Sequence, residues 1–412
     1  MTIRRFLRRL LNGFAVLALL GVLGIGALFA FLWLEHRSAA TLPTPTGQFA
    51  VGRAIQDWTD SLTSDTVAPV PGAKRELLVW IWYPAVAGGS AVNGEYLPPE
   101  LRPKAEDTGA ANIWTLLTRD ASKIRGHSIR DPDVLPHARS YPVVIFRAGA
   151  SSGVLNYSTL VEDLASHGYV VVGFDAPYRT GRVIFPDGRV TFRTEKNNPE
   201  ACVVSDRAQM ERCVSRVLIA WTSDIAFVLD RLARLNASDS SGKFTGRLDM
   251  TRVGVLGHSL GGAVAAQFCH DDSRCKAGID IDGAPHGSVI QAGLHQPFMF
   301  LLSDHSHESD SASNQIRTDI QSIYDRIPPD RRLRVTIHGA FHYMFSDDGA
   351  VMKSSVVRGL LRVFGRLGMS GRRQLAVTAY CVRTCFDAYL KGEGASRPSI
   401  ASPVYPEAQV LR

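Results

Sequence analysis

Short apolar runs alternate with longer amphipathic stretches through most of the chain. The apolar runs occupy residues 142–146, 169–174, 253–256, 277–281, 297–302 and 333–337. Helical patterns stand between several of them, notably at 155–167 and 215–235. Strands that are apolar throughout and separated by helices are typical of a mostly parallel sheet with helices on both faces. The pattern therefore predicts an α/β fold.

Two long polar segments interrupt this pattern. Residues 84–141 and 176–213 are rich in Pro, Gly and charged residues, and the second contains a hairpin-turn sequence at 186–188. We expect one helix in the first segment, at 113–123. Both segments are candidate insertions that cap a pocket, although solvated surface loops look the same in sequence.

The limits of the folded domain follow from its outer elements. A β-rich run at 77–83 comes before the polar segments, and a last helix is expected at 372–390. We therefore predict one domain over 48–398, followed by a C-terminal tail at 399–412.

The N-terminus has the composition of a membrane anchor. Residues 13–34 carry no charge, and at about 1.5 Å per residue a helix of this length covers the roughly 30 Å hydrocarbon core of a bilayer. Four arginines within residues 1–12 place that end in the cytoplasm and the domain on the other side, periplasmic or extracellular. Residues 35–47, broken by prolines, are predicted to be a linker.

A cleaved signal peptide is the alternative interpretation of the same segment. Signal peptides usually have an apolar stretch of about 7–15 residues and a cleavage site of small residues. This stretch is longer, and its candidate site at 38–40 lies behind Glu35 and Arg37. A single-pass signal anchor is therefore the prediction, with secretion after cleavage as its rival.

Charge gives no indication of a nucleic-acid partner. Much of the net charge of +7 comes from the N-terminal arginines, and no basic stripe with interleaved aromatic residues follows.

The six cysteines suit an oxidising compartment. Cys202 with Cys213, and Cys269 with Cys275, are spaced for local disulfides. The third pair is four residues apart in a predicted helix, where Cβ atoms lie about 5–6 Å apart, too far for the roughly 3.8 Å of a disulfide. We expect buried free thiols there.

The segment 253–262 carries the clearest chemical signal. It places Gly-x-Ser-x-Gly directly after a buried strand and before a helix, which is the context of a nucleophile elbow. The turn is so tight that only glycine fits at Gly257 and Gly261. Ser259 is the candidate nucleophile, and the backbone N–H of Leu260 would face an oxyanion at the helix N-terminus.

A serine nucleophile needs a base that an acid holds in one tautomer. Asp280 and Asp282 end one predicted strand; Asp282 lies nearer the loop and is preferred as the acid, with Asp280 a structural partner at the sheet edge. After the last strand, His342 lies in a loop and is preferred as the base. His338 is interpreted as a packed or hydrogen-bonded neighbour.

These motifs resemble those of the platelet-activating factor acetylhydrolase family, in its plasma and type II forms. The matching segments are Gly-His-Ser-Leu-Gly-Gly at 257–262, Gly-Ile-x-x-Asp at 278–282 and Gly-x-x-His-x-x-Phe-x-Asp at 339–347. The resemblance spans residues 48–392. It implies an α/β-hydrolase fold with Ser259, Asp282 and His342 as nucleophile, acid and base.

The sequence departs from this family in the loop after the first central strand. The family usually has Ser-His-Gly, whereas this chain has Arg147-Ala148-Gly149-Ala150. A backbone donor needs no particular side chain, so Ala150 is the candidate second oxyanion donor beside Leu260.

No metal or cofactor is expected. The stretch 303–310 contains Asp, His and Glu, but a polar loop beyond a strand explains it more simply than a metal site.

The sequence therefore predicts a serine esterase that hydrolyses acyl esters through an acyl-enzyme. The resemblance implies short or oxidised acyl groups on glycerophospholipids. A general carboxylesterase, or a polyester or dienelactone-type hydrolase for soluble esters, is the nearest alternative. A membrane-tethered binding protein without turnover is the alternative of another class. The sequence leaves the oligomeric state open.

Overall fold

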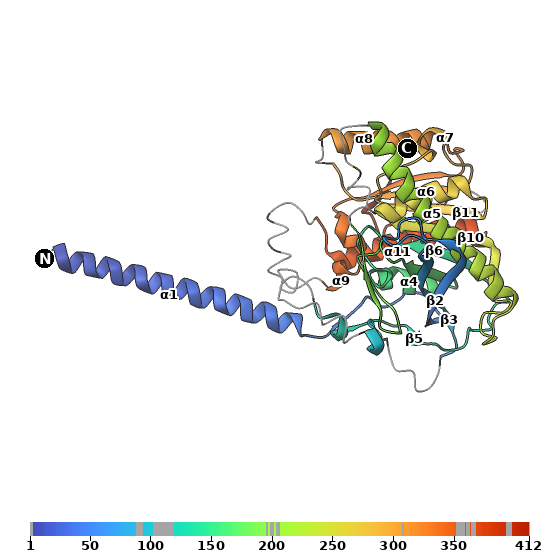
Figure 1. Cartoon of the computed structure of the whole chain (residues 1–412). Helices are drawn as coiled ribbons and strands as arrows, with labels where there is room; N and C mark the ends of the chain where they lie inside the picture. Colours follow the sequence, from blue (N-terminus) through green and yellow to red (C-terminus); the bar gives the residue numbers. More distant parts are fainter. Residues whose placement is uncertain are drawn as a thin grey trace.

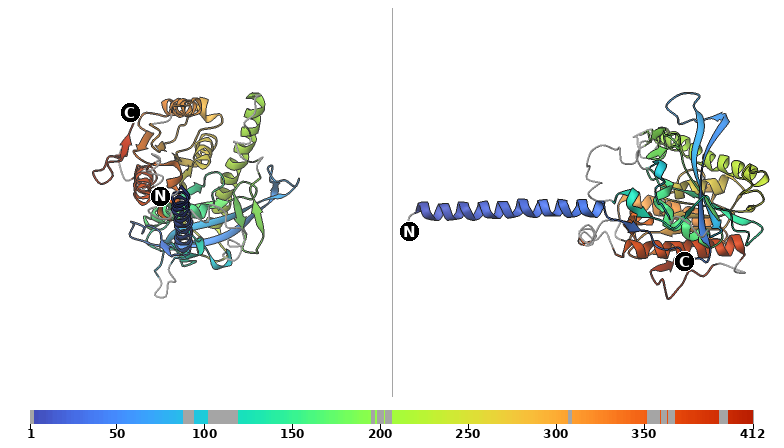
Figure 2. Two further views of the ribbon diagram at one scale, coloured as in Figure 1. Left: turned by 90° about the vertical axis from the view of Figure 1, so that its left-hand side faces the viewer. Right: turned by 90° about the horizontal axis from the view of Figure 1, so that it is seen from below.

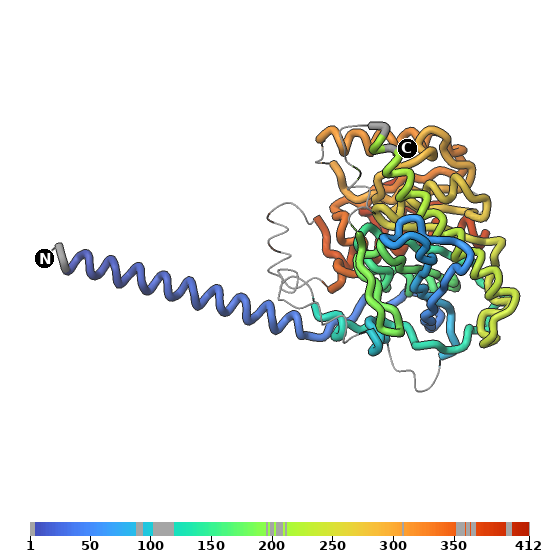
Figure 3. The backbone as a smooth tube through the Cα atoms, viewed as in Figure 1, coloured from blue at the N-terminus to red at the C-terminus, as the bar shows by residue number. Residues whose placement is uncertain are grey.

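The fold is known from a computed structural model of the chain (Figures 1 and 3). It describes residues 3–87, 94–101, 119–194, 197, 202, 207–306, 309–351, 359, 363, 368–392 and 398–411.

A twisted central sheet organises the domain. In the described part of the chain it has ten strands, in the order β14-β13-β12-β11-β10-β6-β7-β3-β2-β5. The strands between β13 and β7 in this order run parallel, whereas β14, β3 and β2 each pair antiparallel with a neighbour. Their bounds are β2 Ala50–Ser64, β3 Lys74–Ala85, β5 Ile129–Arg130, β6 Tyr141–Arg147, β7 Val170–Asp175, β10 Leu248–His258, β11 Cys275–Ile281, β12 Phe298–Leu302, β13 Arg332–Ile337 and β14 Ala408–Val410.

Helices cover both faces of this sheet, and each face has its own buried core. One core contains side chains of α4 (Ser158–Ser166) and α11 (Gly371–Phe386), and the other contains side chains of α5 (Arg207–Ala237), α6 (Leu260–Asp271) and α8 (Ser311–Arg326). The central strands contribute to both cores because successive side chains point to opposite faces. This arrangement confirms the predicted α/β-hydrolase architecture.

Shorter elements complete the described structure. They are β1 Ala40–Thr41, β4 Ile124–Arg125, the hairpin β8 Arg182–Ile184 with β9 Val190–Phe192, helices α7 Val289–Ala292 and α9 Asp348–Val351, a π-helical turn Asp387–Lys391, and the 3₁₀ turns η1 Pro99–Leu101, η2 Ala121–Lys123, η3 Val154–Tyr157 and η6 His342–Phe345.

The two predicted insertions have little regular structure of their own. The hairpin turn expected at 186–188 joins β8 and β9. Of the helix expected at 113–123, residues 113–118 lie outside the described part and residues 121–123 form only a 3₁₀ turn. Strand β5 extends the sheet beside β2, so part of the first segment belongs to the domain core.

The predicted linker is bound to the domain. Residues 40–41 pair with β4, and the Leu42 side chain is buried. The backbone N–H of Thr46 donates to Asp163 Oδ1 over 2.8 Å. The predicted linker at 35–47 therefore contacts the domain through its backbone pairing and hydrogen bonds.

Part of the predicted tail at 399–412 lies in the sheet, where β14 pairs antiparallel with β13 at the edge. Leu411 N donates to Arg334 O, which extends this pairing by one residue.

Helix α1 (Ile3–His36) stands apart from the globular body (Figures 1 and 2). Its most apolar stretch has a mean hydropathy of 2.6 over 18 residues and is almost entirely exposed. By length and composition it is able to cross a membrane, as residues 13–34 predicted.

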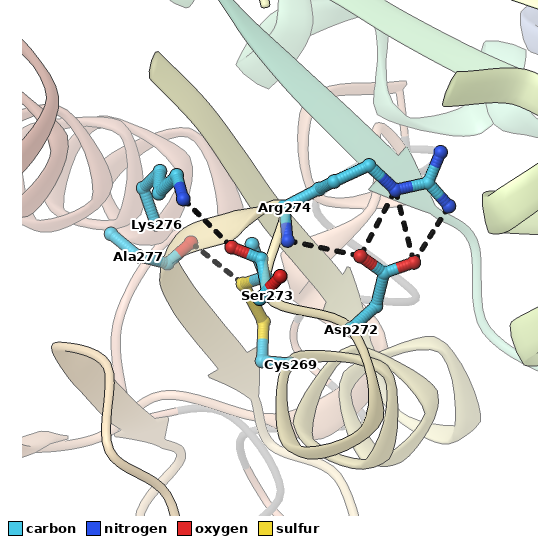
Figure 4. Close-up of a disulfide and its surroundings, with 7 residues drawn as sticks. Cys269, Asp272, Ser273, Arg274, Lys276 and Ala277 are labelled. Carbon is cyan, nitrogen blue, oxygen red and sulfur yellow. Dashed lines mark hydrogen bonds and ion pairs between the residues drawn. A yellow bond between two sulfur atoms is a disulfide. The ribbon is translucent and has the colours of Figure 1, made fainter. Parts of the chain in front are cut away.

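Both local disulfides that the spacing suggested are present. Cys202 is bonded to Cys213, and Cys269 to Cys275. The second links the end of α6 to the start of β11, beside the Asp272–Arg274 ion pair (Figure 4). Cys381 and Cys385 are buried free thiols on α11.

Candidate active site

Ser259 occupies the sharp turn between β10 and α6. Its φ of 55° lies in the left-handed region, which a non-glycine residue rarely adopts and which marks strain at functional turns. A Cβ on Gly257 would lie 2.2 Å from the backbone of Gly261, and one on Gly261 would lie 2.3 Å from Arg147 O. The turn therefore requires glycine at both positions, as the elbow motif predicts.

Asp282 follows β11 and also has a φ of 55°. Its carboxylate is completely shielded from solvent. Burial alone would raise the pKa of Asp282, but hydrogen bonds from His305 and His342 outweigh it and hold that pKa well below its usual range. Asp282 is therefore a buried carboxylate that remains ionised.

His342 is the first residue of the turn η6, beyond β13. Its Nδ1 lies 2.8 Å from Asp282 Oδ2, and an ionised carboxylate only accepts, so Nδ1 carries the hydrogen. Nε2 is then the nitrogen that is able to take a proton. His338 is exposed, and its Nδ1 lies 3.5 Å from Asp304 Oδ2, so of the two roles expected for it, packed or hydrogen-bonded neighbour, its contact is polar.

The three residues share one cavity of about 610 Å³. Its wall also contains Leu302, Ile316, Ile320 and Leu411, together with several polar side chains. Among the described residues, none from 84–141 or 176–213 contributes to this wall, so the described parts of the two candidate caps do not enclose it. Ser259 Oγ and His342 are not hydrogen-bonded to one another in the described structure; that bond is often long in hydrolases without substrate.

The loop 148–150 lies against the elbow. A Cβ on Gly149 would lie 3.2 Å from Ser259 Cβ, which brings this loop next to the nucleophile. Leu260 is the first residue of α6, and the first N–H groups of a helix have no acceptor within it. Gly149, next to Ala150 in the chain, and Leu260 thus lie beside Ser259 on two elements.

Arg147, where the family has a different residue, points away from this loop. Its guanidinium lies 4.3 Å from the ring centres of both Phe174 and Trp221, and Nη1 donates to Phe174 O. Burial lowers the pKa of Arg147 to about 10, so it stays charged at neutral pH. Cation–π contacts with these two rings stabilise its charge, within the core that contains the side chains of α5.

Sequence reasoning missed the role of Tyr157. Its hydroxyl accepts a hydrogen bond from Gly149 N (3.3 Å) and lies 2.8 Å from His258 Nδ1. Burial raises the pKa of Tyr157 to about 12 and lowers that of His258 to about 3, so both groups are neutral and share a hydrogen bond. Tyr157 therefore links the 148–150 loop to the residue before Ser259.

The contact of His305 with Asp282 was also missed. His305 belongs to the polar stretch after β12 that was considered for a metal, and its Nε2 lies 2.8 Å from Asp282 Oδ1. No group of three or more metal-binding side chains is found in the described part of the chain. The position of His305 just after β12 could have indicated this contact. Strands β12 and β11 are neighbours in the sheet, so the segments that follow them begin at the same edge.

Comparisons with known proteins point to esterases. Residues 188–379 match the family model described as platelet-activating factor acetylhydrolase, isoform II. A probable 1-alkyl-2-acetylglycerophosphocholine esterase of Arthroderma benhamiae is 25% identical over 79% of this chain and 80% of its own length. The platelet-activating factor acetylhydrolase of Bos taurus is 26% identical, but the match spans 50% of this chain and 48% of that protein.

A solved structure shares the fold. Ferulic acid esterase from Streptomyces cinnamoneus superposes with a TM-score of 0.72, at 24% identity, over 91% of this chain and 100% of that one.

Proposed function

Since the chain is a serine hydrolase that acts on ester bonds and resembles the platelet-activating factor acetylhydrolase family, we propose that Ser259, His342 and Asp282 are its catalytic triad. The observation that carries this proposal is the 2.8 Å bond between His342 Nδ1 and Asp282 Oδ2, in the cavity that Ser259 lines.

Each residue has one task in the proposed reaction. Ser259 Oγ forms a bond to the ester carbonyl carbon while its proton passes to His342 Nε2. The C–O bond of the tetrahedral intermediate then breaks, and the alcohol leaves with that proton. Water repeats the sequence on the acyl-serine, giving the acid and restoring Ser259. Asp282 remains ionised throughout and stabilises the charged imidazole.

The oxyanion is stabilised by backbone donors. We assign this role to the N–H groups of Leu260 and Ala150. The dipole of α6 adds to the effect of Leu260, because the positive end of that helix faces the developing negative charge.

The proposed substrates are short or oxidised acyl esters of glycerophospholipids. The acetylglycerophosphocholine ester in the name of the Arthroderma relative supports this class. The aliphatic side chains in the cavity wall, including Ile316 and Ile320, offer an apolar surface to an acyl chain. Helix α1 would hold the enzyme at a membrane, where such lipids are found.

The triad is tested with the full-length protein in detergent, using p-nitrophenyl acetate and butyrate. Ser259→Ala and His342→Ala should abolish turnover, and His338→Ala should retain it. A folded parent that neither turns over any ester nor reacts with a fluorophosphonate would instead be a binding protein.

The substrate class is tested separately. The parent is compared on 1-alkyl-2-acetylglycerophosphocholine and on the two aryl esters, by kcat/KM. A clear preference for the phospholipid supports the proposal. Activity on aryl esters alone would make the protein a general carboxylesterase.

The anchor is tested in cells. The full-length protein should sediment with membranes, resist extraction by carbonate and retain its N-terminal residues in mass spectra. Soluble protein that begins near residue 38–40 would show that the helix is a cleaved signal.

A further inference from the structure

Each carboxylate oxygen of Asp282 is hydrogen-bonded to an imidazole. Oδ2 lies 2.8 Å from His342 Nδ1, and Oδ1 lies 2.8 Å from His305 Nε2. A triad needs only the first of these contacts. The triad therefore does not explain why His305 is bonded to the second carboxylate oxygen.

Ser303 completes the shell around the carboxylate. Its backbone N–H donates to Oδ1 over 2.8 Å, and its hydroxyl donates to Oδ2 over 2.6 Å. Ser303 Oγ is also 3.1 Å from His305 Nε2. With both oxygens held by two donors each, the carboxylate plane is not free to rotate about its last side-chain bond.

His305 is more exposed than the carboxylate that it contacts. Its side chain is 36% exposed and lines the cavity, whereas that of Asp282 is 0% exposed. The bond to an ionised carboxylate requires a hydrogen on Nε2, which neutral and charged imidazole both supply.

We propose that His305 is a positioning residue for the triad acid: it fixes the orientation of Asp282 through Oδ1, so that Oδ2 stays aimed at His342. This inference rests on the triad proposed above. Without the donor, Oδ1 keeps only the Ser303 N–H and becomes open to water from the cavity. Asp282 then holds His342 less well, which slows the proton transfer on which acylation depends.

A pair of variants separates the donor from the bulk of the ring. His305→Gln keeps an N–H near the position of Nε2, and His305→Met keeps similar volume without a donor. His295→Met is the matched control, because His295 is exposed and lies outside the cavity wall. All are made in the full-length protein, and their melting temperatures are compared with the parent.

The readouts are kcat and KM for p-nitrophenyl butyrate and the rate of fluorophosphonate labelling. We expect His305→Met to lower kcat and labelling roughly ten- to hundredfold with KM unchanged, as small misplacements of catalytic groups do. His305→Gln should recover most of that loss. Equal losses in both variants, an unchanged kcat in the Met variant, or a rise in KM alone would overturn the inference.

The same set of assays distinguishes a failure of this inference from a failure of the triad proposal. An active parent with an inactive Ser259→Ala variant leaves the triad standing, whatever His305 does. An inactive, unlabelled parent overturns the triad itself.

Discussion

The side-chain carboxyl group of Asp347, whose pKa burial raises to about 8, accepts hydrogen bonds from the first turn of α4, with Oδ2 2.8 Å from Ser158 N. Oδ1 accepts a second hydrogen bond, from Thr159 N. Asp347 lies just beyond the turn that carries His342, and α4 follows the loop that carries Ala150. The residue thus joins the segment of the proposed base to the segment of the proposed oxyanion donor Ala150, two parts of the chain that lie nearly two hundred residues apart.

Asp347→Ala should therefore weaken both the fold and the site. Removing a side-chain acceptor at a helix N-terminus costs about 1–2 kcal/mol, and the loss should appear in urea unfolding. We also expect a lower kcat. Asp330→Ala, at an exposed carboxylate in the turn before β13, is the control. An unchanged unfolding midpoint for Asp347→Ala would mean that the carboxylate does not act as a cap.

Asp280 should make stability fall as the pH rises. Burial, with a smaller contribution from the nearby negative charge of Asp282, raises the pKa of Asp280 to about 8. The hydrogen bond that Oδ1 accepts from Gly283 N lowers this pKa, but by less than burial raises it. In the unfolded chain the group titrates near pH 4. The native state thus holds one extra proton between about pH 4 and 8. The stabilisation is complete below pH 4 and is lost as the pH passes 8.

Asp280→Asn removes this ionisation at nearly constant size. Its free energy of unfolding should depend less on pH between 5 and 8, by up to about 1.4 kcal/mol per pH unit. Urea midpoints at several pH values measure this slope for parent and variant. Parallel curves would show that Asp280 does not hold a proton in the native state.

The cysteines should fall into two chemical classes. Thiol labelling of the folded protein should modify none of them, since two pairs are oxidised and Cys381 and Cys385 are buried. Denaturation without reductant should expose Cys381 and Cys385 alone, as peptide mass mapping would show. Labelling of Cys269 under those conditions would contradict the second disulfide. Reduction of that short loop should cost about 2 kcal/mol of stability.

Tyr157→Phe tests the bridge to the oxyanion loop. The ring still packs on Phe146, whose centroid lies 4.7 Å away, but Gly149 N loses its acceptor. We expect kcat for p-nitrophenyl butyrate to fall about tenfold with KM little changed, because the loss of a whole oxyanion donor costs more, roughly 10²–10³. Tyr169→Phe is a matched control, since its hydroxyl bonds Asp387 instead. Equal activity of parent and Tyr157→Phe would show that the loop holds its shape unaided.

The sequence predicted those elements that leave a local pattern, such as a run of apolar residues or glycines at a fixed spacing. Strands β6, β7 and β10–β13 are mostly apolar because the sheet is covered on both faces. The elbow at Ser259 was recognisable because a tight turn imposes glycine at fixed positions. The preference for Asp282 over Asp280 followed from its place beyond the strand end, and the structure puts Asp282 beside His342.

Other features depend on partners far away in the chain. Strand β2 has few consecutive apolar residues, because its second half is largely exposed and is held by pairing with β3. Strand β14 is only three residues long, too short to show an alternating pattern, and it is a strand because it pairs with β13. The contact of His305 with Asp282 depends on the adjacency of two strand ends, which a loop composition does not reveal.

The pairing of β14 with β13 has a practical consequence for expression work. Leu411 lies in the wall of the cavity that holds Ser259, so a fusion behind it starts next to that cavity. A polyhistidine tag at that position would add imidazoles and bulk beside this cavity. Kinetic constants from such a fusion would describe a partly obstructed enzyme, and a tag with a cleavable site is the safer choice for this protein.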